Sequence, residues 1–300
     1  DIGTTTVGLN LVDLESGSIL HTSSFENPQR FGGSDVMNRI SYDSGVFRGE
    51  LQQTMLSAIN FEIGNMVKLL GFHRRQIFDA VFVGNTTMRD ILFGIDVQPI
   101  GEKPYKSLIQ IEHEDRRRKT TAIDTSALSL GLRVFPKARV YSGPLIGCHI
   151  GSDIAADLLT IGIDNTQDPV MLVDIGTNTE VVIGNKDKMV AASCPAGPAF
   201  EGGQITYGMP GYEGAIESVT IQKDGIVAST IGEKAAQGIC GSGLIDLLAE
   251  LRRTDYMTEL GVLHDNNERF VFNDNDMSLN RADISNLAQA KSANYAGQFI

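Results

Sequence analysis

The sequence lacks the features that define several classes of protein. It has no tryptophan, three cysteines in 300 residues, and no apolar run near the roughly 20 residues that a membrane-spanning helix needs. No stretch of it reads as a signal peptide. Its cysteines, Cys148, Cys194 and Cys240, lie far apart without a Cys-x-x-Cys pair, so we expect no disulfide framework and no zinc or iron–sulfur site. We therefore predict a protein of the reducing cytoplasm.

An excess of positive charge is also missing. The chain carries 25 basic and 37 acidic residues, a formal net charge of −12, which argues against nucleic acid and anionic membranes as partners. Its five histidines show no metal-binding spacing, and no Gly-x-Ser-x-Gly or other nucleophile motif is present. An acidic protein can still bind ATP, because local backbone amides and Mg²⁺ neutralise the phosphates.

What the sequence does contain is a repeated hexapeptide. Asp1–Thr6 reads DIGTTT, and Asp174–Thr179 reads DIGTNT. The glycine in each copy permits a tight turn and lets a phosphate approach the backbone, while hydroxyl and N–H groups hold phosphate oxygens. We predict two related loops that grip one nucleotide between them, with the binding residues Gly3, Thr4, Thr5 and Thr6 in the first loop and Gly176, Thr177, Asn178 and Thr179 in the second.

The aspartate that opens each hexapeptide points to a metal ion. A carboxylate this close to phosphate does not bind it directly, so its natural partner is a hydrated Mg²⁺ that bridges the two groups. We therefore predict Asp1 and Asp174 as metal ligands. Asp153 is a third candidate ligand, but as part of a helix start it needs no metal, and both interpretations stay open.

Each hexapeptide opens the same pattern of predicted structure. Alternating apolar residues and turn residues predict a hairpin after it, formed by 7–14 and a strand from Ile19 in the first copy and by 181–183 and 189–192 in the second. We also expect short buried strands at 81–84 and 170–174, and helices at 51–70, 152–161 and 282–300. Strands interleaved with helices indicate the α/β class.

The length favours two domains over one, because 300 residues exceed the size of a typical single core. We place the first domain at 1–165 and the second at 166–300. No strand precedes Asp1, and the sequence stops inside the expected final helix, so we expect a piece of a longer protein, truncated at both ends.

Two glycine-rich segments follow the second hexapeptide. In Cys194–Gly203, the amides of Gly202 and Gly203 are predicted to face a phosphate or ribose, or else the segment is a tight crossover loop. In Gly238–Gly243, Gly241 and Ser242 open a helix whose free first-turn amides favour an anion. The second segment is equally well explained as an ordinary helix start. Glu201 is either a metal or ribose ligand or a surface carboxylate.

The chain resembles a known family through motifs that run in order across almost its whole length: DIGTTTVGLNLVDL, NPQRFGGSDVMNRI, VGNTTM, VDIGTNTEVVIGN, ASCPAGPAFEGGQITYGM and GICGSGLIDLLAEL. The two hexapeptides are similar to the phosphate motifs of the actin, sugar-kinase and Hsp70 superfamily. The last three motifs resemble the ATPase portion of the reductive activators of corrinoid proteins. The resemblance implies an α/β fold of two related actin-like, ribonuclease-H-like domains with a nucleotide cleft between them.

The resemblance also implies an activity. Binding and hydrolysis of ATP with Mg²⁺ would drive the reduction of an inactive Co(II) corrinoid to Co(I). Asp1 and Asp174 would be the catalytic residues, with Asp174 orienting metal-bound or attacking water. The implied partner is a corrinoid protein, either a corrinoid iron–sulfur protein or a corrinoid methyltransferase component, and a homodimer is one expected assembly.

Parts of the family pattern are not in this sequence. Its members carry an N-terminal ferredoxin-like [2Fe–2S] domain, and the adenosine-binding glycine pair is expected beyond Ile300. Three other functions stay open: a small-molecule kinase of the same fold, a nucleotide-regulated interaction module, and an activator of radical dehydratases. The last needs two cysteines that meet in space, and this sequence shows no clear pair.

Overall fold

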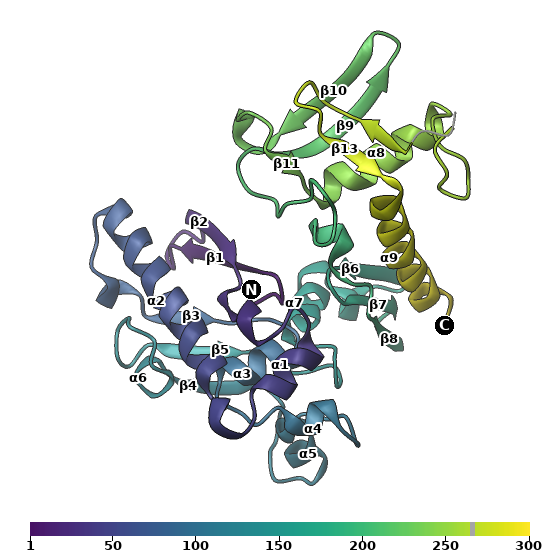
Figure 1. Cartoon of the computed structure of the whole chain (residues 1–300). Helices are drawn as coiled ribbons and strands as arrows, with labels where there is room; N and C mark the ends of the chain where they lie inside the picture. Colours follow the sequence, from purple (N-terminus) through teal and green to yellow (C-terminus); the bar gives the residue numbers. More distant parts are fainter. Residues whose placement is uncertain (265–267) are drawn as a thin grey trace. The chain divides into compact units, whose positions relative to one another are not determined.

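The computed structural model describes residues 1–264 and 268–300 (Figure 1). The chain divides into two units: one comprises Asp1–Val170 and Ile183–Ala191, and the other comprises Met171–Val182 and Ala192–Ile300. In the described part of the chain, no helix combines the length and the apolar character that crossing a membrane requires. The predicted division at residue 165 stays a prediction.

The first hairpin starts at the last threonine of the first hexapeptide. Strand β1 (Thr6–Val12) pairs antiparallel with β2 (Ile19–Glu26), and Thr6 lies opposite Glu26. The turn between the strands is closed by Asp13, whose carboxylate accepts hydrogen bonds from the amides of Glu15 and Ser16. The predicted hairpin is thus confirmed.

A second sheet of the first unit has the order β3-β5-β4, with β3 (Asp79–Val81) parallel and β4 (Ile123–Ser126) antiparallel to β5 (Arg139–Ser142). The prediction of a buried strand at 81–84 was wrong. The strand ends at Val81, which is 63% exposed. Beyond it the backbone turns toward the first hexapeptide, where the Val83 carbonyl accepts a hydrogen bond from the Ile2 amide at 2.8 Å.

The longest helix of the first unit is α2 (Glu50–Leu70). Leu51, Met55 and Ile59 recur on one face of it and are almost completely buried, as an amphipathic helix requires. Gly71 ends the helix in the left-handed conformation, as predicted. The other helices of this unit are α1 (Val36–Tyr42), α3 (Thr86–Leu92), α4 (Gln98–Gly101), α5 (Leu108–Glu114), α6 (Ala127–Leu130) and α7 (Ser152–Ile161), with the 3₁₀ helices η1 (Pro28–Gly32), η2 (Gly45–Phe47), η3 (Arg74–Gln76) and η4 (Ile163–Asn165).

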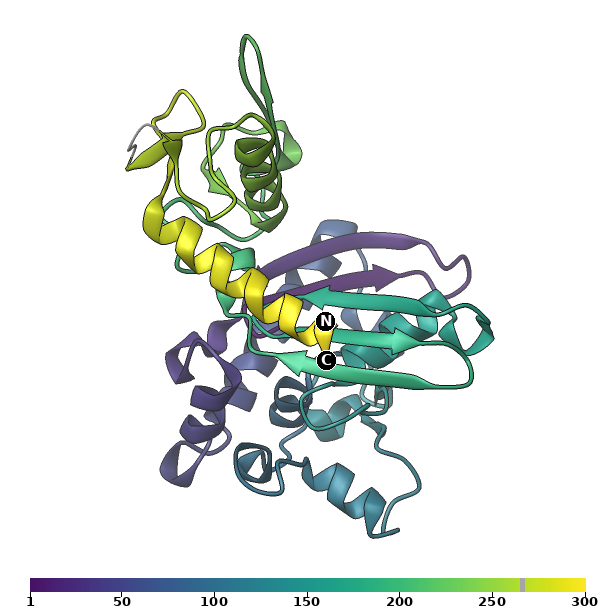
Figure 2. The ribbon, with the colours of Figure 1, turned by 90° about the vertical axis from the view of Figure 1, so that its right-hand side faces the viewer.

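The second hexapeptide lies within a three-stranded sheet of order β6-β7-β8, whose strands run side by side in Figure 2. Its strands are β6 (Val170–Ile175), β7 (Thr179–Gly184) and β8 (Met189–Cys194). As in the first copy, the strand after the loop starts at the sixth residue of the hexapeptide. Strand β6 was predicted to be buried, but Met171 is 52% and Ile175 is 47% exposed, because β6 is an edge strand.

The second unit adds two small sheets and two helices. Strand β9 (Ala215–Gln222) lies between β10 (Gly225–Thr230) and β11 (Gly238–Ile239), and β12 (Arg269–Val271) pairs with β13 (Ser278–Asn280). Helix α8 (Gly241–Arg253) packs on β9, and the 3₁₀ helices are η5 (Pro198–Glu201) and η6 (Ile231–Glu233). Asn280 caps α9 (Arg281–Phe299) in a capping box with Asp283. The predicted C-terminal helix is therefore confirmed.

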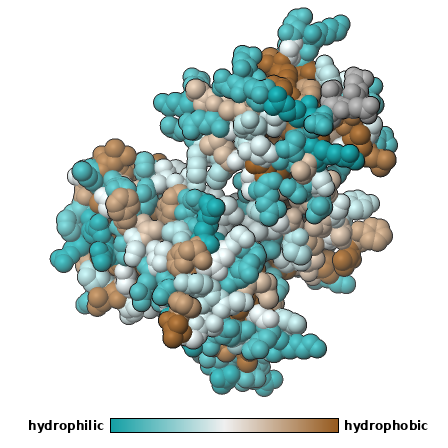
Figure 3. Space-filling view, in the orientation of Figure 1, coloured by the Kyte–Doolittle hydropathy of each residue, from teal (hydrophilic) through white to brown (hydrophobic). Residues whose placement is uncertain are grey.

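Each unit has its own hydrophobic core. In the first, α2 and α3 contribute the fully buried Leu51, Met88 and Leu92; in the second, Ile239 and Leu244 are fully buried. On the face shown in Figure 3, hydrophobic residues form separate patches on a largely hydrophilic surface.

Candidate functional site

The first hexapeptide loop is held from behind by hydrogen bonds to three successive carbonyl groups. The Gly3 carbonyl accepts from Asn27 Nδ2 at 2.8 Å, that of Thr4 from Arg39 Nη2 at 2.6 Å, and that of Thr5 from the Asn27 amide at 2.8 Å. In a trans peptide the N–H of the next residue points away from the carbonyl. Each of the following three amides, up to that of Thr6, is therefore turned away from the donor that binds the carbonyl of its own peptide group, and successive backbone N–H groups of this kind suit an anion.

Glycine is required at the third position of this loop. A Cβ atom on Gly3 would lie 2.5 Å from the Thr6 carbonyl oxygen. The backbone therefore closes on itself more tightly than any side chain permits. The predicted residues Gly3, Thr4, Thr5 and Thr6 are brought together in one compact turn.

The Thr4 side chain is held as firmly as its backbone. Its hydroxyl oxygen accepts a hydrogen bond from Asn85 Nδ2 at 3.0 Å, and Thr4 is 6% exposed. Asn85 is itself fixed, because its Oδ1 caps α3 by accepting from the Met88 amide at 3.0 Å. The Thr4 hydroxyl acts as an acceptor in this contact, so its proton can be donated to a ligand.

Asp153 lies on the same unit as Asp1 and is connected to the first loop through close backbone contacts. A Cβ atom on Gly84 would lie 2.8 Å from the Ile2 carbonyl oxygen, and the Ser152 amide donates to the Gly84 carbonyl at 3.0 Å. Asp153 follows in the first turn of α7. Asp1 and Asp153 are thus next to two residues, Ile2 and Ser152, that both contact Gly84.

The Asp1 and Asp153 carboxylates limit which kind of metal site the first loop can provide. Within 1–264 and 268–300, no group of three or more His, Cys, Asp or Glu residues is arranged to hold an ion. Mg²⁺ bound to nucleotide phosphates keeps several waters and needs only one or two protein carboxylates. Asp1 and Asp153 belong to no larger ligand cluster among the described residues, and their binding of a phosphate-bound Mg²⁺ stays a prediction.

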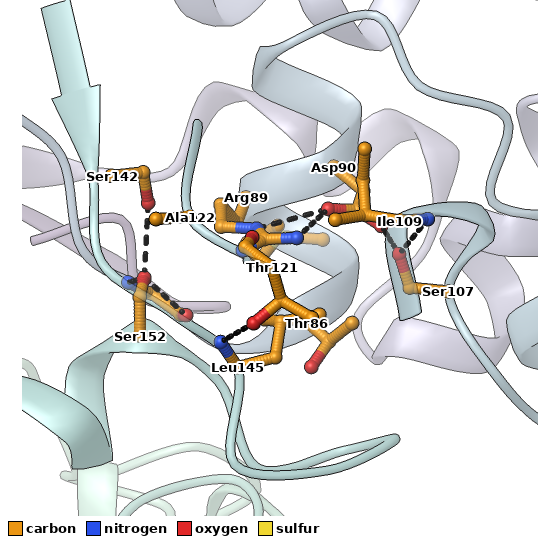
Figure 4. Close-up of polar contacts among 12 residues, drawn as sticks. Thr86, Arg89, Asp90, Ser107, Ile109, Thr121, Ala122, Ser142, Leu145 and Ser152 are labelled. Carbon is orange, nitrogen blue, oxygen red and sulfur yellow. Dashed lines mark hydrogen bonds and ion pairs between the residues drawn. The ribbon is translucent and has the colours of Figure 1, made fainter. Parts of the chain in front are cut away.

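A buried polar network supports the helix that carries Asn85 (Figure 4). Arg89 binds the Asp90 carboxylate through Nη2 at 2.8 Å and Nε at 3.0 Å, and it donates to the Thr121 carbonyl at 3.0 Å. Ser107 donates to the other Asp90 oxygen. Burial raises the pKa of Asp90, an effect that Arg89 and Ser107 oppose. Arg89 and Asp90 are at most 1% exposed, so this network fixes α3 from inside the core.

The second hexapeptide loop is held by different groups. The Thr177 carbonyl accepts a hydrogen bond from the Gly197 amide at 2.8 Å, and the Thr177 hydroxyl donates to the Glu201 carboxylate. The Gly176 amide donates to the Asn178 carbonyl at 3.2 Å. These contacts place Glu201 directly beside the loop, so it is not simply a surface carboxylate.

The other second-loop residues lie next to these contacts. Asp174 is half-buried near the end of β6, and Thr179 is completely buried at the start of β7. Glu180 follows it and accepts a hydrogen bond from the Ser193 hydroxyl at 2.8 Å. All predicted residues of the second copy therefore belong to one continuous turn of the second unit.

The glycine-rich segments pack against each other. A Cβ atom on Gly202, which has a φ of 81°, would lie 2.5 Å from the Met209 amide nitrogen, and one on Gly203 would lie 2.6 Å from Pro198 Cβ. A Cβ atom on Gly241 would lie 1.9 Å from the Phe200 carbonyl oxygen. These glycines thus have a packing role, and their contact with a nucleotide stays a prediction.

Gly241→Ala is expected to lower the free energy of unfolding of the second unit by about 1–3 kcal/mol, because the new methyl group overlaps the Phe200 carbonyl. Urea denaturation measures the change. Gly211→Ala is the matched control, since its Cβ would lie 3.6 Å from Ile231 Cδ1, an ordinary contact. Equal stability of the two variants would contradict this packing role.

The cysteines and Ser242 are engaged locally. Cys240 donates from Sγ to the Ile216 carbonyl at 3.3 Å and lies 3.4 Å from the Ser242 hydroxyl. Cys148, Cys194 and Cys240 are free thiols, and burial raises the pKa of Cys148. Among the described residues, they belong to no group of three or more His, Cys, Asp or Glu side chains that could hold a metal ion.

Sequence reasoning missed several residues that shape the first loop. Asn27, Arg39 and Asn85 all bind it, although they lie between 24 and 81 positions away in the sequence. The available signal was the pair of motifs NPQRFGGSDVMNRI and VGNTTM, which supported the family resemblance without revealing a role.

The chain is similar to proteins that activate corrinoid proteins. It is 33% identical over 263 residues to the corrinoid activation enzyme RamQ of Eubacterium limosum, covering 87% of this chain and 42% of RamQ. It is 26% identical over 223 residues to the Co(II) methylated amine-specific corrinoid protein reductase of Methanosarcina barkeri, covering 72% of this chain and 39% of that reductase. The chain thus spans less than half the length of these relatives.

A solved structure shows the same fold. The reductive activator for corrinoid,iron-sulfur protein superposes with a TM-score of 0.88 at 36% identity, over 99% of this chain and 49% of the other. Two family models match: the RACo middle region over 1–166, and the C-terminal domain of RACo, the ASKHA domain, over 168–300. The predicted resemblance and the actin-like fold are confirmed, and the chain belongs to the RACo family of reductive activators.

Proposed function

We propose that this chain is the ATP-binding and ATP-hydrolysing part of a reductive activator that returns a Co(II) corrinoid protein to Co(I). The observation that carries the proposal is the first loop, where three carbonyls are bound from behind and the amides face the other way. Such a loop is complementary to phosphate oxygens. Membership of the RACo family and the similarity to corrinoid activators support the choice of partner.

In the proposed reaction, the first loop binds phosphate through its amides and the Thr4 hydroxyl. Asp1 and Asp153 would hold Mg²⁺, which neutralises charge on the phosphates. Asp174 orients the water that attacks the terminal phosphate, and ATP and water become ADP and phosphate. A reduced iron–sulfur cluster would supply the one electron that converts Co(II) to Co(I), and would itself be oxidised. We propose that this cluster, of the [2Fe–2S] type, lies in a part of the protein outside this chain.

The proposal is tested with the intact protein and a corrinoid protein in the Co(II) state, under anaerobic conditions with a reductant for the cluster. Absorbance of Co(I) and release of ADP are followed together. We expect Co(I) to accumulate with MgATP, and neither Co(I) nor ADP to form with a non-hydrolysable ATP analogue. Equal formation of Co(I) without nucleotide would refute the role of ATP. Phosphate transfer to a small molecule in place of water would instead identify a kinase.

A further inference from the structure

Arg39, on α1, is a completely buried guanidinium group in contact with the first loop. Its Nη2 donates to the Thr4 carbonyl at 2.6 Å, and its Nε donates to the Gly33 carbonyl at 3.0 Å. Nη1 faces Met88 Sδ at 3.0 Å and Gln29 Oε1 at 3.5 Å. Every one of these partners is uncharged.

Arg39 therefore differs from the other completely buried arginine of the same unit. Arg89 is paired with Asp90, whereas Arg39 forms no ion pair within 4.0 Å among the residues that the structure describes. Asp35 acts on Arg39 only through its longer-range charge and uses its carboxylate to cap α1 at the Asn38 amide. A buried charge without a counter-ion is strongly destabilising, so an anion that binds nearby is favoured.

The guanidinium remains charged at neutral pH. Burial lowers the pKa of Arg39 to about 10, with Asp35 acting in the opposite direction. A group with this pKa is almost fully protonated at pH 7.

The Thr4 carbonyl links this charge to the opposite side of the loop. The carbonyl of Thr4 and the N–H of Thr5 belong to the same peptide group and point in opposite directions. A charged donor on the carbonyl polarises the peptide group and makes its N–H a stronger donor. The charge of Arg39 thus acts on the side of the loop where phosphate is proposed to bind.

We propose that Arg39 is a positioning residue for a Mg²⁺-bound polyphosphate at the first loop, where it fixes the Thr4 carbonyl and supplies an uncompensated positive charge behind the loop. This inference rests on the proposed nucleotide function. It assigns to the motif NPQRFGGSDVMNRI a role in binding the phosphate chain, with no direct contact between Arg39 and the ligand.

The test compares Arg39→Met, which keeps an unbranched side-chain stem and removes the charge, with Arg39→Lys, which keeps the charge. The control is Arg139→Met, the same substitution at an exposed arginine of the same unit that pairs with Asp124. Dissociation constants for MgATP and for Mg-tripolyphosphate are measured by calorimetry, and the rise in melting temperature with each ligand is measured in parallel. If Arg39 has only a structural role, its substitution lowers the melting temperature measured without ligand. The dissociation constants and the ligand-induced rise in melting temperature then stay unchanged.

We expect Arg39→Met to weaken both ligands by about tenfold or more, since the loss of a unit charge from behind the loop acts on this scale at an intermediate dielectric constant. Arg39→Lys is expected to stay within about threefold of the unsubstituted protein, and Arg139→Met to leave affinity unchanged. If Arg39→Met does not fold, Arg39→Gln takes its place with the same expectation. The inference is overturned if the uncharged variant binds both ligands with an affinity within about twofold of that of the unsubstituted protein. It is also overturned if Arg39→Lys loses as much affinity as the uncharged variant. Absence of binding in the unsubstituted protein refutes the proposed function instead.

Discussion

Asp174→Asn is expected to reduce MgATP hydrolysis by about 10²–10³-fold, the usual effect of removing one group that stabilises or orients the reacting atoms. Asp174 lies half-buried near the end of β6, directly before the loop in which Thr177 is bound by Gly197 and Glu201. Asparagine has nearly the same shape but no negative charge, so it neither attracts Mg²⁺ nor orients water as a carboxylate does. ADP release by the intact protein measures the effect.

The matched control is Asp187→Asn, in the exposed turn between β7 and β8. It removes one negative charge from the same sheet, and its turnover should equal that of the unsubstituted protein. Far-ultraviolet circular dichroism and the urea midpoint establish that both variants are folded. Turnover in Asp174→Asn within about threefold of that in the control would refute the proposed role of this carboxylate.

Asp90→Ala is expected to lower the free energy of unfolding of the first unit by about 3–5 kcal/mol, which is typical when one partner of a buried ion pair is removed. The substitution leaves the Arg89 charge in the core with only carbonyl partners and removes the acceptor of the Ser107 hydroxyl. Figure 4 shows Arg89 and Ser107 in contact with the Asp90 carboxylate. Urea denaturation followed by circular dichroism gives the change.

The control for this second prediction is the pair formed by Arg139 and Asp124, which are both more than half exposed. Asp124→Ala removes a carboxylate of the same kind from the same unit, but water solvates the remaining arginine, so stability should change little. A double variant, Asp90→Leu with Arg89→Met, should be more stable than Asp90→Ala because no uncompensated charge remains. If Asp90→Ala and Asp124→Ala lower the free energy of unfolding by similar amounts, burial of the Arg89–Asp90 pair does not determine its contribution to stability.

Much of the local structure could be predicted because it depends on neighbouring residues. The alternating residues after each hexapeptide form a hairpin, and Gly71 ends α2. The two buried strands were predicted less well. A run of apolar residues signals a strand but does not say whether the strand lies at an edge, and both β3 and β6 leave large apolar side chains exposed.

The polar groups behind the loops could not be predicted from the sequence for a different reason. Asn27, Arg39 and Asn85 reach the first loop through tertiary contacts, and Glu201 reaches Thr177 across 24 positions. Nothing in local propensity distinguishes an arginine that will be buried beside a loop from one at the surface. The repeated hexapeptide identified where phosphate is expected to bind, but the residues that orient each copy required the fold.

The two copies of the hexapeptide are nearly identical in sequence but differ in the direction of their hydrogen bonds. The Thr4 hydroxyl accepts a hydrogen bond from Asn85, whereas the Thr177 hydroxyl donates one to Glu201. The Thr4 hydroxyl can therefore donate a hydrogen bond to a ligand oxygen, whereas the Thr177 hydroxyl already donates its hydrogen bond to a carboxylate. A cation stands behind the first loop and an anion beside the second. The two loops are thus electrically unlike, so we expect that exchanging one for the other would not preserve phosphate binding.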